Sequence, residues 1–338
     1  MASTKVIGTH SGSFHCDEAL AVGLLRMTKE FAGAGVVRSR DPEVLATADV
    51  VVDVGGVYDA DKNLFDHHQR GFTGTFGEGF ETTLSSAGLV YKHFGREIVA
   101  SVADIADDAV LELVYNKMYV NFVEAIDAID NGISQYPAEL KPAYKSNGTD
   151  LGSRVAALNP RWNEVLEAPA DEPDTDPVQA RFEKAVAITT EAFVGKLEGL
   201  VHSWLPARDI VAAALDAAPS VHPSGEVILL ETTCPWKAHL MELEEERGIA
   251  GSVKYALFTD RSGAWRIQAV PISPDSFQSR LPLPEPWRGV RDAELDAKAE
   301  LGVDGAIFVH ASGFIGGHKT YEGVVAMANK ALALAGEA

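Results

Sequence analysis

The sequence predicts an α/β protein of about two domains. The length of 338 residues gives the domain number. The opening order of strand, polar loop and helix is typical of a βαβ unit. Three consecutive valines at 50–52 are typical of parallel strands that are buried on both faces. A hydrophobic content of 46% with a mean hydropathy near zero describes a globular chain with ample core.

The first 70 residues alternate between short strands and helices. Residues 5–9 are expected to form the first strand, followed by a polar loop and a helix over 18–25. Residues 36–37 suit a second strand, and Asp41 before Pro42 is typical of a helix start. The valine strand ends at Asp53, and Phe65 leads directly into Asp66-His67-His68. Polar side chains therefore follow several predicted strands.

The middle of the chain is predicted to be mainly helical. A loop rich in glycine and threonine over 71–83 precedes Ser85, which could cap a helix through Phe94. A long helical pattern over 104–130 is followed by Gly132, a plausible C-cap. Asp127 and Asp130 are three residues apart and would share a face of that helix. An acidic, proline-rich loop at 168–177 and a connector helix at 182–200 suggest domains at 1–200 and 201–338.

The second half reads as a smaller α/β region. We expect strands at 227–230, 255–259, 265–270 and 306–309, with helices at 235–246 and 320–334. Gly316, Gly317, His318 and Lys319 lie between a strand and a helix, where backbone amides and a lysine would favour phosphate. A plain glycine-rich turn is the alternative. Trp287 and Phe277 could stack on bases, although core packing is the simpler role for Phe277.

Charge and cysteine content narrow the classes of function. The formal net charge of −20 counts against a generic non-specific nucleic-acid binder. It does not count against a nuclease, because clustered carboxylates bind divalent cations. Cys16 and Cys234 form no CxxC pair, which excludes a cysteine-rich zinc module. No apolar run approaches the roughly 18 residues needed to cross a bilayer, and the N-terminus does not resemble a signal peptide, so we expect a cytoplasmic or nuclear protein without membrane partners.

Nine polar residues stand at or near the ends of predicted elements and could form one site. Histidine and carboxylate ligands without thiolate suit Mn²⁺, Mg²⁺, Fe²⁺ or Zn²⁺. Their number is too large for one ion but suits two ions roughly 3.5–4 Å apart, as in enzymes of phosphoryl chemistry. The candidates are His10, His15, Asp17, Asp53, Asp66, His67, His68, Asp127 and Asp130.

Each candidate also has an ordinary structural interpretation. His10 could be a hydrogen-bonded loop histidine, and Asp17 a carboxylate stabilised by a helix dipole. Asp53 before two glycines could be turn chemistry. Either Asp127 or Asp130 could lie on a solvated helix face. Asp66-His67-His68 is harder to explain in this way, because neighbouring histidines after a strand rarely serve packing.

These residues resemble the motifs of the DHH phosphoesterase superfamily, and the chain as a whole resembles the Myg-type (melanocyte proliferating gene) exonucleases. The resemblance spans nearly the whole chain. It rests on the segments 7–20, 51–56, 119–135, 202–208, 276–284 and 310–319. It implies an N-terminal DHH domain with a mainly parallel sheet flanked by helices, a C-terminal mixed α/β domain that binds substrate, and a site in the cleft between them.

The resemblance also implies roles for single residues. His10 would bind a first ion, Asp17 and His67 a second, and Asp53 would bridge the two. His68 would face the substrate and Asp66 would support the ligands from behind. His15 stands where the superfamily usually has an aspartate, which favours Mn²⁺, with Mg²⁺ as the alternative. Asp130 fits the late carboxylate better than Asp127. Gly316, Gly317, His318 and Lys319, together with Arg280, would bind substrate.

The activity that the resemblance implies is 3′→5′ exonucleolytic hydrolysis of single-stranded RNA. One alternative is a small-molecule phosphatase, a pyrophosphatase or a phosphoesterase of short oligonucleotides, which the net charge of −20 would suit. A second alternative is a metal-binding interaction protein without turnover. The resemblance adds a mitochondrial pool to the expected locations. The oligomeric state stays open.

Overall fold

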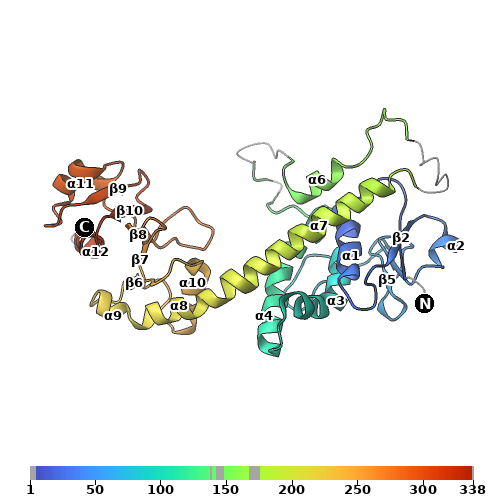
Figure 1. The fold of residues 1–338 in the computed structure, drawn as a ribbon, viewed down its shortest axis with the longest axis horizontal. Coiled ribbons are helices and arrows are strands. Elements are labelled where there is room, and N and C mark those ends of the chain that lie inside the picture. The colour runs from blue at the N-terminus through green and yellow to red at the C-terminus, as the bar shows by residue number, and fades with distance from the viewer. Residues whose placement is uncertain (1–4, 138, 142–147, 167–175, 337–338) are drawn as a thin grey trace. The chain divides into compact units, whose positions relative to one another are not determined.

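The computed structural model describes residues 5–137, 139–141, 148–166 and 176–336. The chain folds into two compact units, Met1–Leu200 and Val201–Ala338, each with its own sheet (Figure 1). Most of the loop predicted at 168–177 lies outside the described residues. Within the described part of the chain, every helix is too short or too polar to cross a membrane.

The first unit contains a five-stranded sheet in the order β2-β1-β3-β5-β4. Strand β1 pairs in parallel with β2 and β3, β3 pairs in parallel with β5, and only β4 is antiparallel to its neighbour. The elements are β1 (Val6–Thr9), α1 (Cys16–Arg26), β2 (Gly35–Arg38), α2 (Pro42–Leu45), β3 (Val50–Val52), β4 (Tyr58–Asp59), η1 (Ala60–Lys62), β5 (Leu64–Phe65), α3 (Ser86–Ala103), α4 (Asp108–Met118), η2 (Tyr119–Val123), α5 (Glu124–Asp130), α6 (Leu151–Ala156) and α7 (Gln179–Gly199).

Helix α1 is the central helix of this unit. It packs against both α3 and α7, and all but its last residue are buried (Figure 1). The helical pattern predicted over 104–130 is confirmed, but it is divided into α4, the π-helical turn η2 and α5. Gly132 follows the end of α5 with φ of 67°, as expected for a C-terminal glycine.

The second unit contains a mixed sheet in the order β6-β7-β8-β10-β9. Strands β6 and β7 are parallel, and the other pairs are antiparallel. The elements are η3 (Leu200–Trp204), α8 (Leu205–Asp216), α9 (Ala218–Val221), β6 (Val227–Leu229), α10 (Trp236–Glu246), β7 (Tyr255–Thr259), β8 (Trp265–Ala269), η4 (Glu285–Trp287), α11 (Asp292–Ala299), β9 (Ala306–Val309), β10 (Ile315–His318) and α12 (Tyr321–Gly336).

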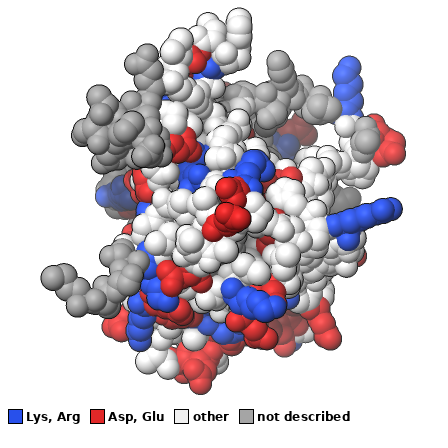
Figure 2. All heavy atoms as spheres, turned by 90° about the vertical axis from the view of Figure 1, so that its right-hand side faces the viewer, with Lys and Arg blue, Asp and Glu red and all other residues white. Residues whose placement is uncertain are grey.

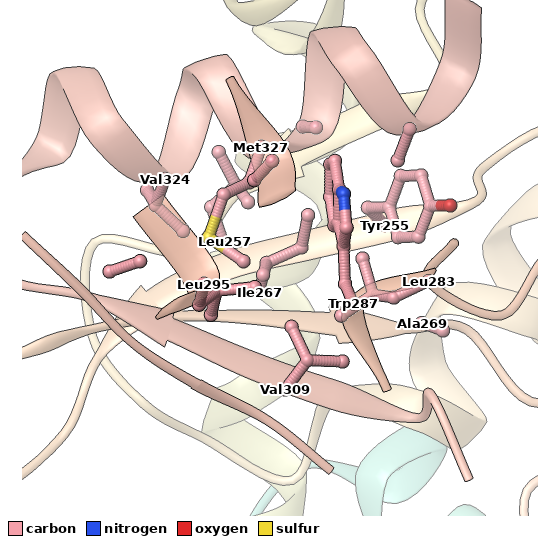
Figure 3. Close-up of a cluster of buried hydrophobic side chains, with 14 of the residues drawn as sticks. Tyr255, Leu257, Ile267, Ala269, Leu283, Trp287, Leu295, Val309, Val324 and Met327 are labelled. Carbon is pink, nitrogen blue, oxygen red and sulfur yellow. The ribbon is translucent and has the colours of Figure 1, made fainter. Parts of the chain in front are cut away.

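Two hydrophobic layers cover the two faces of this sheet. Leu257 and Ile267 pack with Val324 and Met327 of α12, whereas Ile228 and Ala256 belong to the layer under α8 and α10. Figure 3 shows Trp287 inside the first layer, beside Tyr255 and Leu283. Burial contradicts base stacking for Trp287 and core packing for Phe277.

Trp287 is a core residue, and Phe277 is fully exposed.

The glycine pair of the second unit lies in strand β10 and not in a turn. Gly317 is paired with Arg266 of β8 and with Phe308 of β9. A Cβ atom at Gly317 would lie 2.5 Å from a guanidinium nitrogen of Arg266, so close packing of that side chain explains the glycine. The expectation of a glycine-rich loop is therefore wrong, whereas a substrate role for Gly316, Gly317 and His318 stays a prediction.

Candidate metal centre

Three neighbouring strands of the first sheet bring the predicted ligands to one edge. His10 follows β1, Asp53 follows β3, and Asp66-His67-His68 follow β5. Because β1, β3 and β5 are parallel neighbours, the residues after their carboxyl ends meet at the same edge of the sheet. The polar residues that follow these apolar strands are therefore brought together by the fold.

Asp53 is the central residue of this cluster. One of its carboxylate oxygens, Oδ2, lies 3.3 Å from His10 Nε2, and the other, Oδ1, lies 3.3 Å from His67 Nε2. Its backbone has φ of 59°, a left-handed conformation that aspartate tolerates better than most residues. The chain turns sharply after the buried valines, and Asp53 is 4% exposed.

The first turn of α1 and the residue before it supply a second set of candidate ligands. His15 precedes the helix, and its backbone N–H donates to the Glu18 carboxylate at 2.8 Å. Glu18 is fully buried and lies 3.1 Å from His10 Nε2. Asp17 is also fully buried and accepts a hydrogen bond of 2.7 Å from the Ser86 hydroxyl.

Sequence reasoning missed Glu18. It was assigned only to the helix, although its position three residues after His15 is the one at which a glutamate turns back to a helix start.

Asp130 joins the cluster, whereas Asp127 has a different role. Asp130 Oδ2 lies 3.2 Å from His67 Nε2. Asp127 accepts hydrogen bonds from the N–H and hydroxyl of Ser85, from Gly88 N–H and from the Tyr119 hydroxyl. These donors include the start of α3, so Asp127 caps that helix from 42 residues away along the chain. Asp127 belongs to none of the three ligand groups found among the described residues.

Asp66 and His68 form a pair beside the cluster. Asp66 Oδ2 accepts from Gly56 N–H at 2.5 Å, and Asp66 Oδ1 lies 2.8 Å from His68 Nδ1. Asp66 is buried, whereas 61% of the His68 side chain is exposed. The arrangement orients the His68 ring while leaving it accessible to a ligand.

The residues present could hold metal ions in three overlapping groups. The groups are His10-His15-Glu18-Asp53, Asp53-Asp66-His67-His68 and His15-Asp17-Asp130. Among their buried atoms, Asp17 Oδ1, Asp53 Oδ1 and His67 Nε2 make no hydrogen bond of normal geometry. Buried carboxylates that face one another without hydrogen-bond donors need cations. The donor set therefore fits divalent metals.

The protonation of the cluster reflects its crowded negative charge. Burial lowers the pKa of His10, but contacts with Asp53 and Glu18 raise this pKa by a larger amount, to about 10. Burial also lowers the pKa of His67, but its contacts with Asp130 and Asp53 raise this pKa by more, to about 10. Burial raises the pKa of Asp53, but contacts with His10 and His67 bring it down to about 2. Burial and the neighbouring carboxylates raise the pKa of Asp17 well above its usual range. Protons on the histidines thus balance charge that metal ions could balance.

The second unit contains the two basic residues that were predicted to bind substrate, and their surroundings differ. Both guanidinium NH groups of Arg280 contact the buried Glu244, at 2.8–2.9 Å, and one also donates to Val253 O. This pairing explains Arg280 without a substrate, so its predicted role is not supported. Lys319 follows β10 with an exposed side chain, and its role in substrate binding stays a prediction.

A cavity of about 1070 Å³ opens beside the cluster in the first unit. His15, Asp17, His67, His68 and Asp130 line one part of it, and residues of η2, α5 and α6 line the rest. Any ligand held at the cluster through a phosphate could therefore place its attached groups within the same cavity.

Comparison with known proteins identifies the family. The family model MYG1_exonuc, described as an uncharacterised protein family (UPF0160), matches residues 6–332. The chain is 51% identical to the MYG1 exonucleases of Mus musculus and Homo sapiens, over 97% of this chain and 84–85% of theirs. It is 46% identical to the MYG1 protein YER156C of Saccharomyces cerevisiae, over 98% of this chain and 96% of that protein. The chain therefore belongs to the MYG1 exonuclease family.

Proposed function

We propose that this chain is a divalent-metal-dependent phosphodiesterase that degrades single-stranded RNA from the 3′ end. The exonuclease names of its mouse and human relatives support hydrolysis of nucleic acid. The position of Asp53 supports two ions, because its two carboxylate oxygens contact different histidines, His10 and His67. This single observation carries the proposal.

The first ligand group, together with the His67–Asp130 contact, suggests how the ions are shared. His10, His15 and Glu18 would hold one ion, Asp17, His67 and Asp130 the other, and Asp53 would bridge them. Three histidines among these ligands favour Mn²⁺ over Mg²⁺, which prefers oxygen. When bound, such ions supply a water of lowered pKa and neutralise charge on phosphate oxygens.

The protein side chains would position the phosphate and manage protons. Asp66 holds His68 through Nδ1, so Nε2 is the ring nitrogen left for a ligand. At that position the protonated ring would donate to a phosphate oxygen or to the leaving oxygen. Lys319, exposed after β10, would add a positive charge for the substrate backbone. Asp66 itself would not touch the substrate.

No broad basic surface is needed for this activity. On the face shown in Figure 2, lysine and arginine side chains are scattered among acidic ones and form no continuous stripe. With a net charge of −20, affinity would come from the metal centre and a few local contacts. A phosphoesterase of short oligonucleotides is therefore the second candidate. It predicts rates that do not rise with substrate length.

The test is degradation of a 5′-labelled single-stranded RNA 20-mer with Mn²⁺. We expect a ladder that shortens from the 3′ end and is absent with Asp53→Ala. Asp61→Ala, which removes an exposed carboxylate outside the cluster, should leave the ladder unchanged. A ladder of the same rate from Asp53→Ala would overturn the site. Hydrolysis of dinucleotides or pyrophosphate without any ladder would assign the chain to small substrates.

A further inference from the structure

The cavity beside the metal centre has one wall without charge. Its lining includes Asn121 and Phe122 of η2, Ile126 and Ile129 of α5, and Leu151 of α6. Among the described residues, no lysine or arginine lines the cavity, and Asp130 and Asp150 add negative charge. A second phosphate would be repelled there. The occupant of this wall should be uncharged and partly apolar.

The π-helical turn η2 holds the wall in place. Tyr119 and Val123 of η2 are fully buried, and the Tyr119 ring stacks on Phe76 with ring centres 3.7 Å apart. The Tyr119 hydroxyl donates to Asp127 at 3.1 Å. These contacts fix the inner side of the turn, so Asn121 and Phe122 are the residues of η2 that line the cavity. Such π turns interrupt α-helices frequently at functional sites.

Phe122 and Asn121 offer complementary contacts. The Phe122 ring meets Phe193 of α7 edge to face, with ring centres 5.7 Å apart, which restrains its orientation. The exposed amide of Asn121 makes no hydrogen bond to another described residue and carries both donors and an acceptor. A flat aromatic group with polar edges is the chemistry that matches both side chains.

We propose that this wall binds the nucleobase of the terminal nucleotide, with Phe122 stacking on the base and Asn121 bonded to its polar atoms. The proposal rests on the proposed function, because the base is placed there by a phosphate at the metal centre. It makes the terminal base, and not only the phosphate, part of what the enzyme recognises.

The activity test compares two RNA oligonucleotides that differ only at the 3′-terminal nucleotide, which is either adenosine or an abasic ribose. The wild type should cleave the adenosine substrate with a lower KM. Phe122→Ala should raise that KM by about 5- to 150-fold, the range that corresponds to loss of one base–aromatic stack. Its kinetics on the abasic substrate should not change.

Matched variants separate stacking from folding. Val120→Ala alters the same π turn at a half-exposed position that does not line the cavity, and it should behave as the wild type. Phe122→Leu keeps apolar bulk and should give an intermediate KM if Phe122→Ala fails to fold. Thermal unfolding of each variant checks the fold. An equal loss on both substrates with Phe122→Ala or Phe122→Leu would overturn the proposal.

A binding measurement makes the result independent of turnover. Calorimetry with Mn²⁺-loaded protein should show tighter binding of adenosine 5′-monophosphate than of ribose 5-phosphate, and Phe122→Ala should abolish the difference. Equal affinities in the wild type would overturn the base site. If the wild type degrades no RNA but still discriminates the two ligands, the proposed function fails while the base site stands.

Discussion

Each unit buries charged side chains, but the two sets of charges are satisfied differently. In the second unit, Glu244 accepts hydrogen bonds from Val253 N–H and Gly251 N–H and pairs with Arg280. In the first unit, Asp17 and Asp53 each keep one buried oxygen without a hydrogen bond. Every Glu244 contact comes from a protein donor, whereas the first cluster faces carboxylates toward carboxylates.

The comparison separates a structural charge from a functional one. A buried charge that is completed by protein donors stabilises the fold and needs no ligand. A buried carboxylate beside Glu18 and Asp130 that keeps an oxygen without a hydrogen-bond donor needs a cation from outside the protein. Divalent ions would supply this positive charge. A substitution in the Arg280–Glu244 pair should therefore affect mainly stability, and a substitution in the Asp53 cluster should affect mainly metal binding.

The largest expected effect is on stability, at the Arg280 pair. Arg280→Ala leaves Glu244 buried without its partner and should lower the free energy of unfolding by about 3–5 kcal/mol. Arg208→Ala removes a partly exposed pair with Glu246 and should cost at most about 1 kcal/mol. Urea unfolding measures both. If folded Arg280→Ala loses its affinity for RNA at full stability, Arg280 belongs to the substrate site after all.

The next effect should appear only in the first unit. Mn²⁺ at 100 times its dissociation constant should stabilise the wild type by about 2.7 kcal/mol. Asp53→Asn keeps a residue that tolerates the left-handed backbone but loses the ion pairs with His10 and His67, so it should unfold at a lower temperature than the wild type without Mn²⁺ and gain little from Mn²⁺. Activity of Asp53→Asn should fall at least about a hundredfold. Thermal scans with and without Mn²⁺ test this, and equal stabilisation of both proteins would contradict the assignment.

The pH dependence of metal binding follows from the raised pKa values of His10 and His67, each about 10. A metal ion binds neutral imidazole, so below pH 10 it must displace a proton from each histidine that binds it. Affinity for Mn²⁺ should therefore rise with pH, by up to about 1.4 kcal/mol per pH unit for each proton released. Calorimetry in buffers of different ionisation enthalpy counts these protons. Binding without proton release would contradict the ligand roles.

The same pKa values affect the metal-free protein in the opposite direction. A histidine whose pKa is raised by folding stabilises the fold most below its ordinary value of 6.5, and this contribution is lost as the pH rises toward 10. The free energy of unfolding of the metal-free wild type should therefore fall over that interval. The free energy of unfolding of Arg280→Ala should fall with the same slope, because this substitution leaves both histidines in place.

Local sequence patterns were enough to predict which strand ends come together in the first unit. The strands that end at His10, Asp53 and Asp66 are visible as apolar runs, and parallel pairing then brings their ends together. The role of Asp127 was not predictable, because its donors at Ser85 and Gly88 come from a distant helix. The burial of Glu18 likewise depends on how α1 packs. Tertiary contacts decided both cases.

The glycine pair in β10 shows a different limit. Two consecutive glycines are typical of a turn. In the structure Gly317 instead lies under the Arg266 side chain of the neighbouring strand, which no local pattern reveals. The same limit applies to Phe277 and Trp287, whose burial depends on packing that is distant in sequence.

The smallest expected effect concerns Lys319. Its side chain is exposed, and among the described residues no acidic side chain lies within 4 Å of its ammonium group. Lys319→Ala should raise the KM for RNA up to about fivefold, the size of an exposed charge contact of about 1 kcal/mol. Lys319→Arg keeps the charge and should retain most of the affinity. Mn²⁺ affinity, measured by calorimetry, should be the same in all three proteins. An equal loss of Mn²⁺ affinity in Lys319→Ala would contradict a role of this lysine that is limited to binding the substrate.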